Sequence, residues 1–157
     1  MHLSYLRVVC LLFAALAMGM HLAHALELAP KFQWAPDLYL PVQTSLYRWF
    51  GIIGPVLELI ALLSIATLTV LTRREPAQLR LLAVSVAMLV LGLVVWLTVV
   101  MPANAGIDAW ALSRTAPPDW MRVRAQWQYG QAGIFVLHLI GFCALALSVV
   151  RAPEVRR

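Results

Sequence analysis

Residues 79–101 read LRLLAVSVAMLVLGLVVWLTVVM, an apolar run interrupted only by Arg80 and by single small polar residues. About 20 such residues suffice for a helix to cross the hydrocarbon core of a bilayer. Three further apolar runs have the same character, at residues 3–28, 51–71 and 126–150. None of them alternates polar and apolar residues as transmembrane strands do. The sequence therefore predicts an all-α fold, a bundle of four transmembrane helices.

The composition supports one membrane domain over residues 1–157. Hydrophobic residues make up 62% of the chain and charged residues 12%, whereas soluble domains average about 25% charged residues. This excludes a soluble globule, and also a disordered chain, which needs low hydrophobicity and high charge. The net charge is +5, but the basic residues lie between apolar runs rather than on one polar face, so we expect no nucleic-acid partner. The expected partner is the lipid bilayer, and a homo-oligomer stays open.

Arginines predict the orientation in the membrane. They gather in the link after the second run and in the C-terminal tail: Arg73, Arg74, Arg80, Arg151, Arg156 and Arg157. The positive-inside rule places both segments in the cytoplasm, and four helices then place the N-terminus there too. Segments 29–50 and 102–125 face outward. We expect a multi-pass protein of the bacterial inner membrane with both termini cytoplasmic.

The first apolar run has two interpretations. Arg7 followed by the apolar residues 8–20 resembles a signal peptide, and Ala23-His24-Ala25 resembles its small-residue cleavage site. The alternative is a retained transmembrane helix, and the run is long enough to span the bilayer. Its length, together with the family resemblance given below, favours retention. Charge does not decide between the two, because cleavage leaves the orientation of the other helices unchanged.

The outward segments are expected to contain short helices. Residues 41–50 can form an amphipathic interfacial helix, and residues 108–113 a helical turn. Pro117-Pro118-Asp119 predicts a helix start, so the fourth helix begins outside the membrane near Asp119. On this topology all six tryptophans fall in the outer half, whereas interfacial belts usually occupy both surfaces. This indicates an aromatic cap over the outer end, with a thick interfacial belt as the alternative.

Polar residues inside the predicted spans also gather in the outer half. Ionisable groups cost at least about 2.5 kcal/mol at the bilayer centre, so they mark candidate functional sites. We assign catalytic roles to His24, Glu58 and His138. The candidate substrate-binding residues are His21, Glu27, Asn104, Arg124, Trp127, Gln128 and Gln131. Together they predict a polar cavity that opens outward under the aromatic cap.

Each of these residues also has a structural interpretation. Glu58 lies near the start of its span, where the helix dipole favours an acid. Arg124 can anchor to lipid headgroups through its long side chain. His138 can be a neutral, hydrogen-bonded packing residue.

A metal or other cofactor is not expected, although the histidines leave the question open. His21-x-x-His24-x-x-Glu27 offers metal ligands that Glu58 or His138 could complete. Di-iron carboxylate bundles need more glutamates than these spans contain. No sequence motif supports a haem held by His24 and His138. A haem or a metal ion at His21, His24 or His138 therefore remains an alternative.

Several short motifs resemble those of a known family. They are residues 24–28 (HALEL) with Lys31, Val42-Gln43 with Leu46-Tyr47, Glu58, Pro102-Ala103-Asn104 and Trp120-x-x-x-Arg124-x-x-Trp127. The chain resembles the anthrone-oxygenase-like family of small four-helix membrane proteins. That resemblance implies a retained first helix and cofactor-independent oxygenation of anthrones to anthraquinones. The chain departs from the family pattern near the start of the fourth helix, where Gln128 and Gln131 stand in place of a Glu and a His.

Two kinds of function follow. The first is an enzyme acting on a small hydrophobic aromatic or quinone-like substrate. His24 or His138 would be the general base, Glu58 would orient it, and Arg124 or Asn104 would hold an oxyanion. The alternative is a non-enzymatic protein that binds a lipid or hydrophobic metabolite, or packs against a partner membrane protein. A transporter ranks third, because the inner half offers few polar residues to line a pathway.

Overall fold

The computed structural model describes residues 3–152, and within this part of the chain it contains helices and turns but no strand. Arg156 and Arg157 of the predicted cytoplasmic tail lie outside the described residues. In chain order the helices are α1 (Leu3–Leu26), α2 (Leu28–Lys31), α3 (Pro36–Ser45), α4 (Arg48–Leu71), α5 (Pro76–Val95), the π-helical segment η1 (Trp96–Val100), α6 (Met101–Ser113) and α7 (Trp120–Val150).

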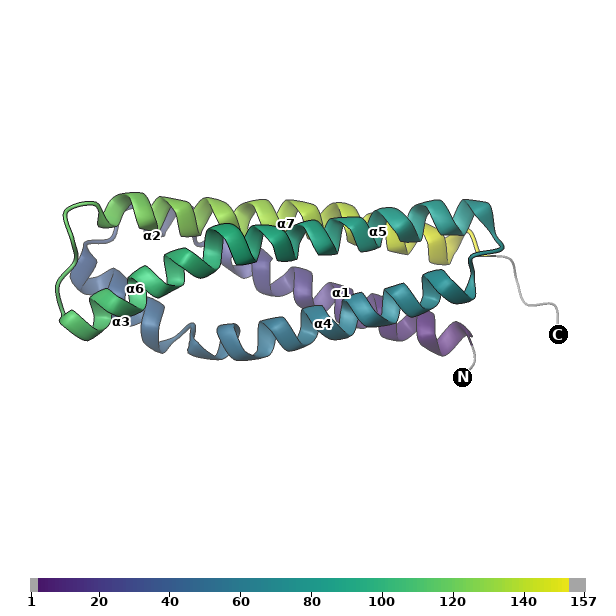
Figure 1. The fold of residues 1–157 in the computed structure, drawn as a ribbon, viewed down its shortest axis with the longest axis horizontal. Coiled ribbons are helices and arrows are strands. Elements are labelled where there is room, and N and C mark those ends of the chain that lie inside the picture. Colours follow the sequence, from purple (N-terminus) through teal and green to yellow (C-terminus); the bar gives the residue numbers. More distant parts are fainter. Residues whose placement is uncertain (1–2, 153–157) are drawn as a thin grey trace.

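The long helices form an up-down-up-down bundle (Figure 1). α1 packs against α4 and α7, and α5 packs against the same two helices. The start of α1 and the end of α7, the two ends of the described chain, lie at one end of the bundle, while α2, α3 and α6 lie at the other (Figure 1). The prediction of an all-α four-helix bundle is confirmed.

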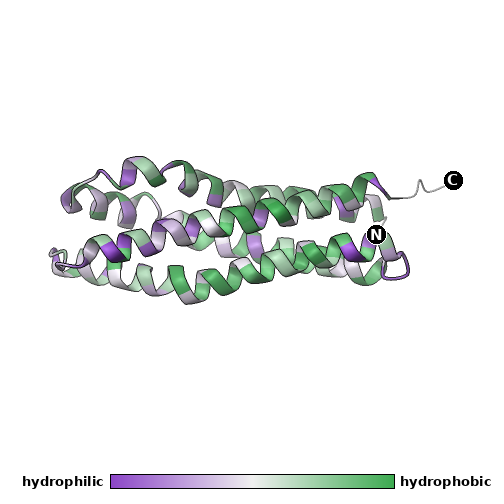
Figure 2. Cartoon of the chain, turned by 90° about the horizontal axis from the view of Figure 1, so that it is seen from above, coloured by the Kyte–Doolittle hydropathy of each residue, from purple (hydrophilic) through white to green (hydrophobic). Residues whose placement is uncertain are grey.

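Four segments are long and apolar enough to cross a membrane: Leu3–Leu26, Arg48–Leu71, Pro76–Ser113 and Trp120–Val150. Hydrophobic residues run along their length, and hydrophilic residues concentrate toward the end of the bundle that carries α2 and α3 (Figure 2). Many large apolar side chains face outward from the bundle, as lipid contact requires. The chain is therefore built as a multi-pass membrane protein.

The structure changes two of the expected boundaries. Residues 102–125 were expected to form an outward segment with a helical turn at residues 108–113, but the third helical segment continues without a break to Ser113. Residues 41–50 do not form one helix, because α3 ends at Ser45 and α4 begins at Arg48. The expected start of the last helix agrees with the structure, since α7 begins at Trp120 with Asp119 at its N-cap.

The third segment continues past Pro102 because its hydrogen-bond register changes there. Proline has no N–H and normally interrupts a helix. In η1 the N–H of Met101 bonds to the carbonyl oxygen of Trp96, one residue further back than in an α-helix. The side-chain amide of Gln126 on α7 donates to the carbonyl of Val99 at 2.9 Å. A side chain from the neighbouring helix thus gives a backbone carbonyl of the irregular segment a hydrogen-bond partner. Such partners are needed inside a bilayer, because no water is available there.

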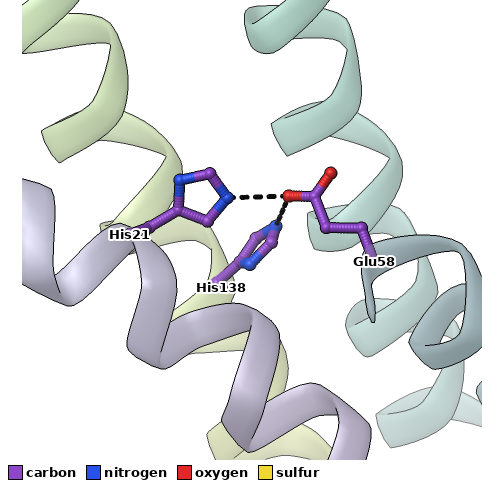
Figure 3. Close-up of side chains that lie close together, drawn as sticks. All are labelled: His21, Glu58 and His138. Carbon is purple, nitrogen blue, oxygen red and sulfur yellow. Dashed lines mark hydrogen bonds and ion pairs between the residues drawn. The ribbon is translucent and has the colours of Figure 1, made fainter. Parts of the chain in front are cut away.

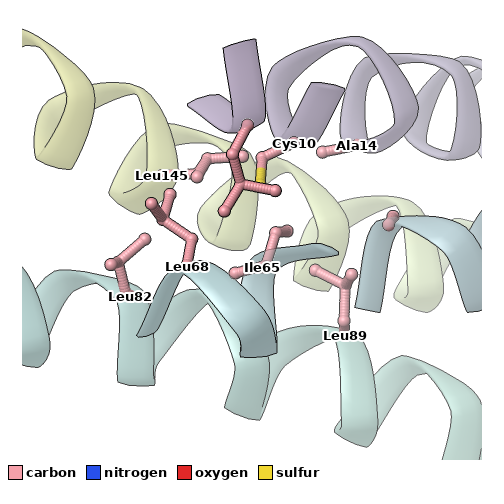
Figure 4. Close-up of a cluster of buried hydrophobic side chains, with 9 residues drawn as sticks. Cys10, Ala14, Ile65, Leu68, Leu82, Leu89 and Leu145 are labelled. Atoms are coloured by element: carbon pink, nitrogen blue, oxygen red, sulfur yellow. The ribbon is translucent and has the colours of Figure 1, made fainter. Parts of the chain in front are cut away.

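Two hydrophobic clusters divide the bundle along its length. The cluster near the chain ends is aliphatic (Figure 4): Leu6, Cys10, Ala14, Ala61, Ile65, Leu68, Leu82, Leu89 and Leu145. The cluster at the other end is rich in aromatic residues: Tyr39, Val100, Ala103, Ile107, Trp110, Trp127 and Ile134. The polar residues described next lie between these clusters along the helices.

Candidate functional site

One carboxylate lies beside two imidazoles where the two hydrophobic clusters meet. His21 of α1, Glu58 of α4 and His138 of α7 form this group, here called the His–Glu–His cluster (Figure 3). Glu58 Oε1 lies 2.7 Å from His21 Nε2 and 3.5 Å from His138 Nε2. His138 is 3% exposed, and the Glu58 side chain is 16% exposed. Three helices thus deliver ionisable side chains to one nearly buried point.

His21 has an oxygen partner at each ring nitrogen. Its Nδ1 lies 2.7 Å from Gln131 Oε1, and its Nε2 faces Glu58. A neutral imidazole carries only one N–H. If Nδ1–H donates to the Gln131 carbonyl oxygen, the lone pair of Nε2 points at a carboxylate. A proton or another cation must then lie between Nε2 and Glu58.

His138 is held close to its neighbours. Its ring meets the ring of His21 edge to face, with centroids 4.9 Å apart. Its Nε2 is buried and has no hydrogen-bond partner. A Cβ added at Gly92 of α5 would lie 2.8 Å from that nitrogen. Glycine at this position therefore makes room for the imidazole.

A cavity of about 580 Å³ adjoins the cluster. Its polar lining includes His21, Glu58 and Gln131, which hydrogen-bond to one another through His21. The rings of Phe50, Trp96 and Trp127 also line it. The other polar and charged residues of the lining include His24, Asn104, Gln43, Thr44, Arg48 and Asp108. Apolar surface together with convergent polar groups is typical of small-molecule sites.

A second cavity of about 210 Å³ lies between α4 and α5. Apart from Glu58 and His138, its lining is apolar or aromatic, and it includes Leu59, Leu93 and Trp96. Both cavities therefore border the cluster, and Glu58 lines both of them.

His24 lies in a different environment from the one we expected. Its ring centroid is 4.9–5.0 Å from those of Tyr47, Phe50 and Trp127, and Nδ1 is 3.8 Å from a Glu27 oxygen. Residues three apart on a helix differ by about 60° in direction and one turn in height. His21 rather than His24 therefore contacts Glu58, and His24 belongs to the aromatic surroundings of the cavity.

A buried lysine organises the neighbouring end of the bundle. The Lys31 ammonium is 0% exposed and lies 2.9 Å from Glu27 Oε2 and 3.3 Å from Gln43 Oε1. It also lies over the rings of Tyr47, at 3.7 Å, and Trp127, at 4.9 Å. The pair of Glu27 with Lys31 is thus part of the structural support around the cavity.

Burial lowers the pKa of Lys31, and the charge of Glu27 opposes that change. For Glu27, burial raises the pKa, but hydrogen bonds from Tyr47 and Lys31 outweigh it. The net pKa of Glu27 lies below its ordinary value. The environment of Glu27 therefore favours the ionised form that pairs with Lys31.

Arg124 and Gln128 lie outside the lining of both cavities. Arg124 Nη1 donates to the carbonyl oxygens of Lys31 and Trp34, at 3.0 and 2.8 Å. It therefore ties the end of α2 to α7. Gln128 is fully buried, and both of its amide atoms lack hydrogen-bond partners.

Of the ten predicted site residues, six line the large cavity: His21, His24, Glu58, Asn104, Trp127 and Gln131. Asn104 Oδ1 accepts a 2.6 Å hydrogen bond from Trp127 Nε1, which fixes the indole. His138 lines the smaller cavity, while Glu27 lies with Lys31. Trp96, which lines both cavities, was missed as a site residue because its sequence position showed only that it belonged to the outer aromatic set.

Comparisons with protein-family models, curated proteins and solved structures found no match to this chain. The function is therefore inferred from the site itself.

Proposed function

We propose that this chain is a membrane enzyme that acts on a small hydrophobic aromatic or quinone-like molecule in the large cavity. The supporting observation is that one cavity is lined both by the hydrogen-bonded residues His21, Glu58 and Gln131 and by aromatic rings. Planar rings can pack against Phe50, Trp96 and Trp127. A hydroxyl or carbonyl group of the same molecule can then face His21 and Glu58.

The pair of Glu58 with His21 would accept a proton from the substrate. A carboxylate 2.7 Å from an imidazole is a suitable arrangement for general base catalysis. In the oxygenation that the family resemblance implies, the base removes a proton from the anthrone methylene, and the carbanion reacts with O₂. One oxygen atom enters the product as a carbonyl, and the other leaves as water with the two methylene hydrogens.

We place the protein in the bacterial inner membrane with both termini in the cytoplasm. Arg73 and Arg74 follow α4 at the end of the bundle that carries the chain ends (Figure 1), and arginine-rich links face the cytoplasm. The large cavity then lies toward the outer side. This proposal retains the first helix, because α1 supplies His21 to the lining of the cavity.

Oxygen uptake by the purified protein tests the enzymatic proposal. We expect uptake with members of a panel of anthrones and quinols. Glu58→Gln should lower kcat by about 10²- to 10⁴-fold, because general base catalysis contributes about that much. His21→Ala should lower it similarly. Glu75→Gln, in the turn after α4 and far from the cavity, is the matched control and should retain kcat.

Two results would contradict the proposal. One is the absence of uptake across the whole panel. The other is uptake that Glu58→Gln and His21→Ala leave undiminished.

The smaller cavity favours a second candidate, the non-enzymatic binding of a lipid or hydrophobic metabolite. Its lining is mostly apolar, and it brings Glu58 and His138 within reach of a polar headgroup. Mass spectrometry of the purified protein would then detect one co-purifying lipid species without turnover of any substrate. Loss of that species in Leu93→Trp, which fills the cavity, would assign it to this place.

A further inference from the structure

We propose that His21, Glu58 and His138 bind a divalent first-row transition metal ion of the Fe²⁺ or Zn²⁺ class. The inference names a cofactor for the site described above. Its catalytic use rests on the proposed function, whereas metal binding itself does not. In this proposal the ion replaces the proton that would otherwise lie between His21 and Glu58.

The spacing of the ligand atoms suits a single ion. One atom from each of the three side chains lies within 4.8 Å of the other two. Bonds of about 2.0–2.2 Å to histidine nitrogen and glutamate oxygen place the ligand atoms about 3–4 Å apart. A slight opening of the 2.7 Å contact between His21 and Glu58, with a rotation of the His138 side chain, reaches that spacing.

The hydrogen-bond acceptors around His21 point to the same conclusion. Gln131 Oε1 accepts from Nδ1–H, and in the neutral imidazole this leaves Nε2 unprotonated toward Glu58. Metal-binding histidines almost always donate their second ring N–H to such an outer partner. Gln131 thus fixes the tautomer that metal binding requires.

His138 provides an independent observation. A shared proton would satisfy His21 and Glu58, but it would leave the buried Nε2 of His138 without a hydrogen-bond partner. A buried polar nitrogen without a hydrogen-bond partner is costly, whether it would donate or accept. An ion beside Glu58 would satisfy all three side chains together.

The ligand types select the metal class. Two imidazoles with one carboxylate are the ligands of non-haem Fe²⁺ oxygenases and of many catalytic zinc sites. Calcium and magnesium prefer sets made of oxygen ligands. Three protein ligands leave coordination positions open, and both cavities reach the cluster. A bound substrate could therefore contact the ion.

Gly92 allows a test that leaves every ligand in place. Gly92→Ala would place a Cβ 2.8 Å from His138 Nε2 and so displace the imidazole. Gly133→Ala is the matched control, because a Cβ there meets nothing within 4 Å. His24→Ala is the matched control for loss of a histidine, since His24 lies on the same helix but outside the cluster.

The experiment measures metal in the full-length protein purified without chelators. We expect about one Fe²⁺ or Zn²⁺ per chain by elemental mass spectrometry, because residues 3–152 contain one such cluster of ligands. After chelator treatment, Co²⁺ titration should restore a stoichiometric site with visible d–d absorption. Glu58→Gln, His138→Ala and Gly92→Ala should weaken Co²⁺ binding at least about tenfold, whereas His24→Ala and Gly133→Ala should not.

If a variant fails to fold, a measurement on the unmodified protein still tests the metal site. Adding Co²⁺ or Zn²⁺ to the stripped protein should raise its Tm, because a ligand of the folded state stabilises it. The absence of both Co²⁺ absorption and a Tm increase would overturn the metal site. Turnover by that metal-free protein would preserve the proposed enzyme, whereas metal binding without any turnover would support the site and count against the enzyme.

Discussion

Two imidazoles lie close to the same carboxylate oxygen of Glu58. An ionised carboxylate inside an apolar bundle is tolerated only when partners compensate its charge. His21 at 2.7 Å is the nearer partner, and His138 at 3.5 Å is the farther one. Removing either imidazole therefore changes the surroundings of the buried carboxylate.

The ion pair of Glu27 with Lys31 gives a pH dependence at the residue scale. The pKa of Glu27 in the folded state lies below its ordinary value of 4.5. A depressed carboxyl pKa contributes stability above the unfolded value, and this stability is lost as pH falls through the folded pKa. The Tm of the unmodified protein should therefore exceed that of Glu27→Gln at neutral pH, and the two should converge under acidic conditions.

Thermal unfolding in detergent, followed by circular dichroism from neutral to acidic pH, measures this difference. Comparing the two proteins removes the contribution of the other acids, which titrate in both. A Tm difference that stays constant over the whole range would contradict the assigned role of Glu27.

Among the elements, the α5–η1–α6 segment departs most from a regular helix. Its π turn accommodates Pro102, and α7 reaches across to bond the Val99 carbonyl through Gln126. The irregular turn places Trp96 beside both cavities and Asn104 against Trp127. The π turn thus helps to position residues that line the candidate site.

Two glutamines on α7 should respond in opposite ways to the same substitution. Gln126→Leu leaves the Val99 carbonyl without its side-chain donor and should destabilise the protein by about 1–3 kcal/mol. Gln128→Leu replaces a fully buried amide that has no hydrogen-bond partner, so it should be neutral or stabilising. Unfolding by chemical denaturant in detergent measures both. Equal destabilisation by the two substitutions would contradict this account.

Sequence patterns were sufficient to locate the four membrane spans, but they did not predict the length of the third. The apolar runs located all four spans, because lipid-facing helices are apolar over a length set by the bilayer. The extension of the third segment to Ser113 could not be predicted from Pro102, which normally ends a helix. It depends on the π turn, which contacts α7 through a hydrogen bond from Gln126.

At the scale of the whole molecule, the bundle has an aliphatic half and an aromatic, polar half. The aliphatic half lies near the chain ends, and the two cavities lie toward the other half.

The proposed orientation predicts which ends of the bundle a membrane-impermeant reagent reaches. In a background without native cysteines, Arg74→Cys should react with a maleimide only after the bacterial inner membrane is permeabilised. Leu112→Cys, which is highly exposed at the opposite end, should react in intact spheroplasts. The reverse pattern would invert the topology and place the cavities on the cytoplasmic side.

The sequence alone determined that this is an all-α membrane bundle with polar residues gathered in one half. Both conclusions depend on hydrophobicity along the chain, which is a local property. Only the tertiary structure decided that His21 rather than His24 meets Glu58, and that Arg124 binds backbone carbonyls instead of lining the cavity. Those choices depend on helix rotation and on the relative heights of packed helices. The rotation and the height of each helix are set by side-chain packing between residues that are distant in the sequence. The pattern of a single apolar run does not contain this information.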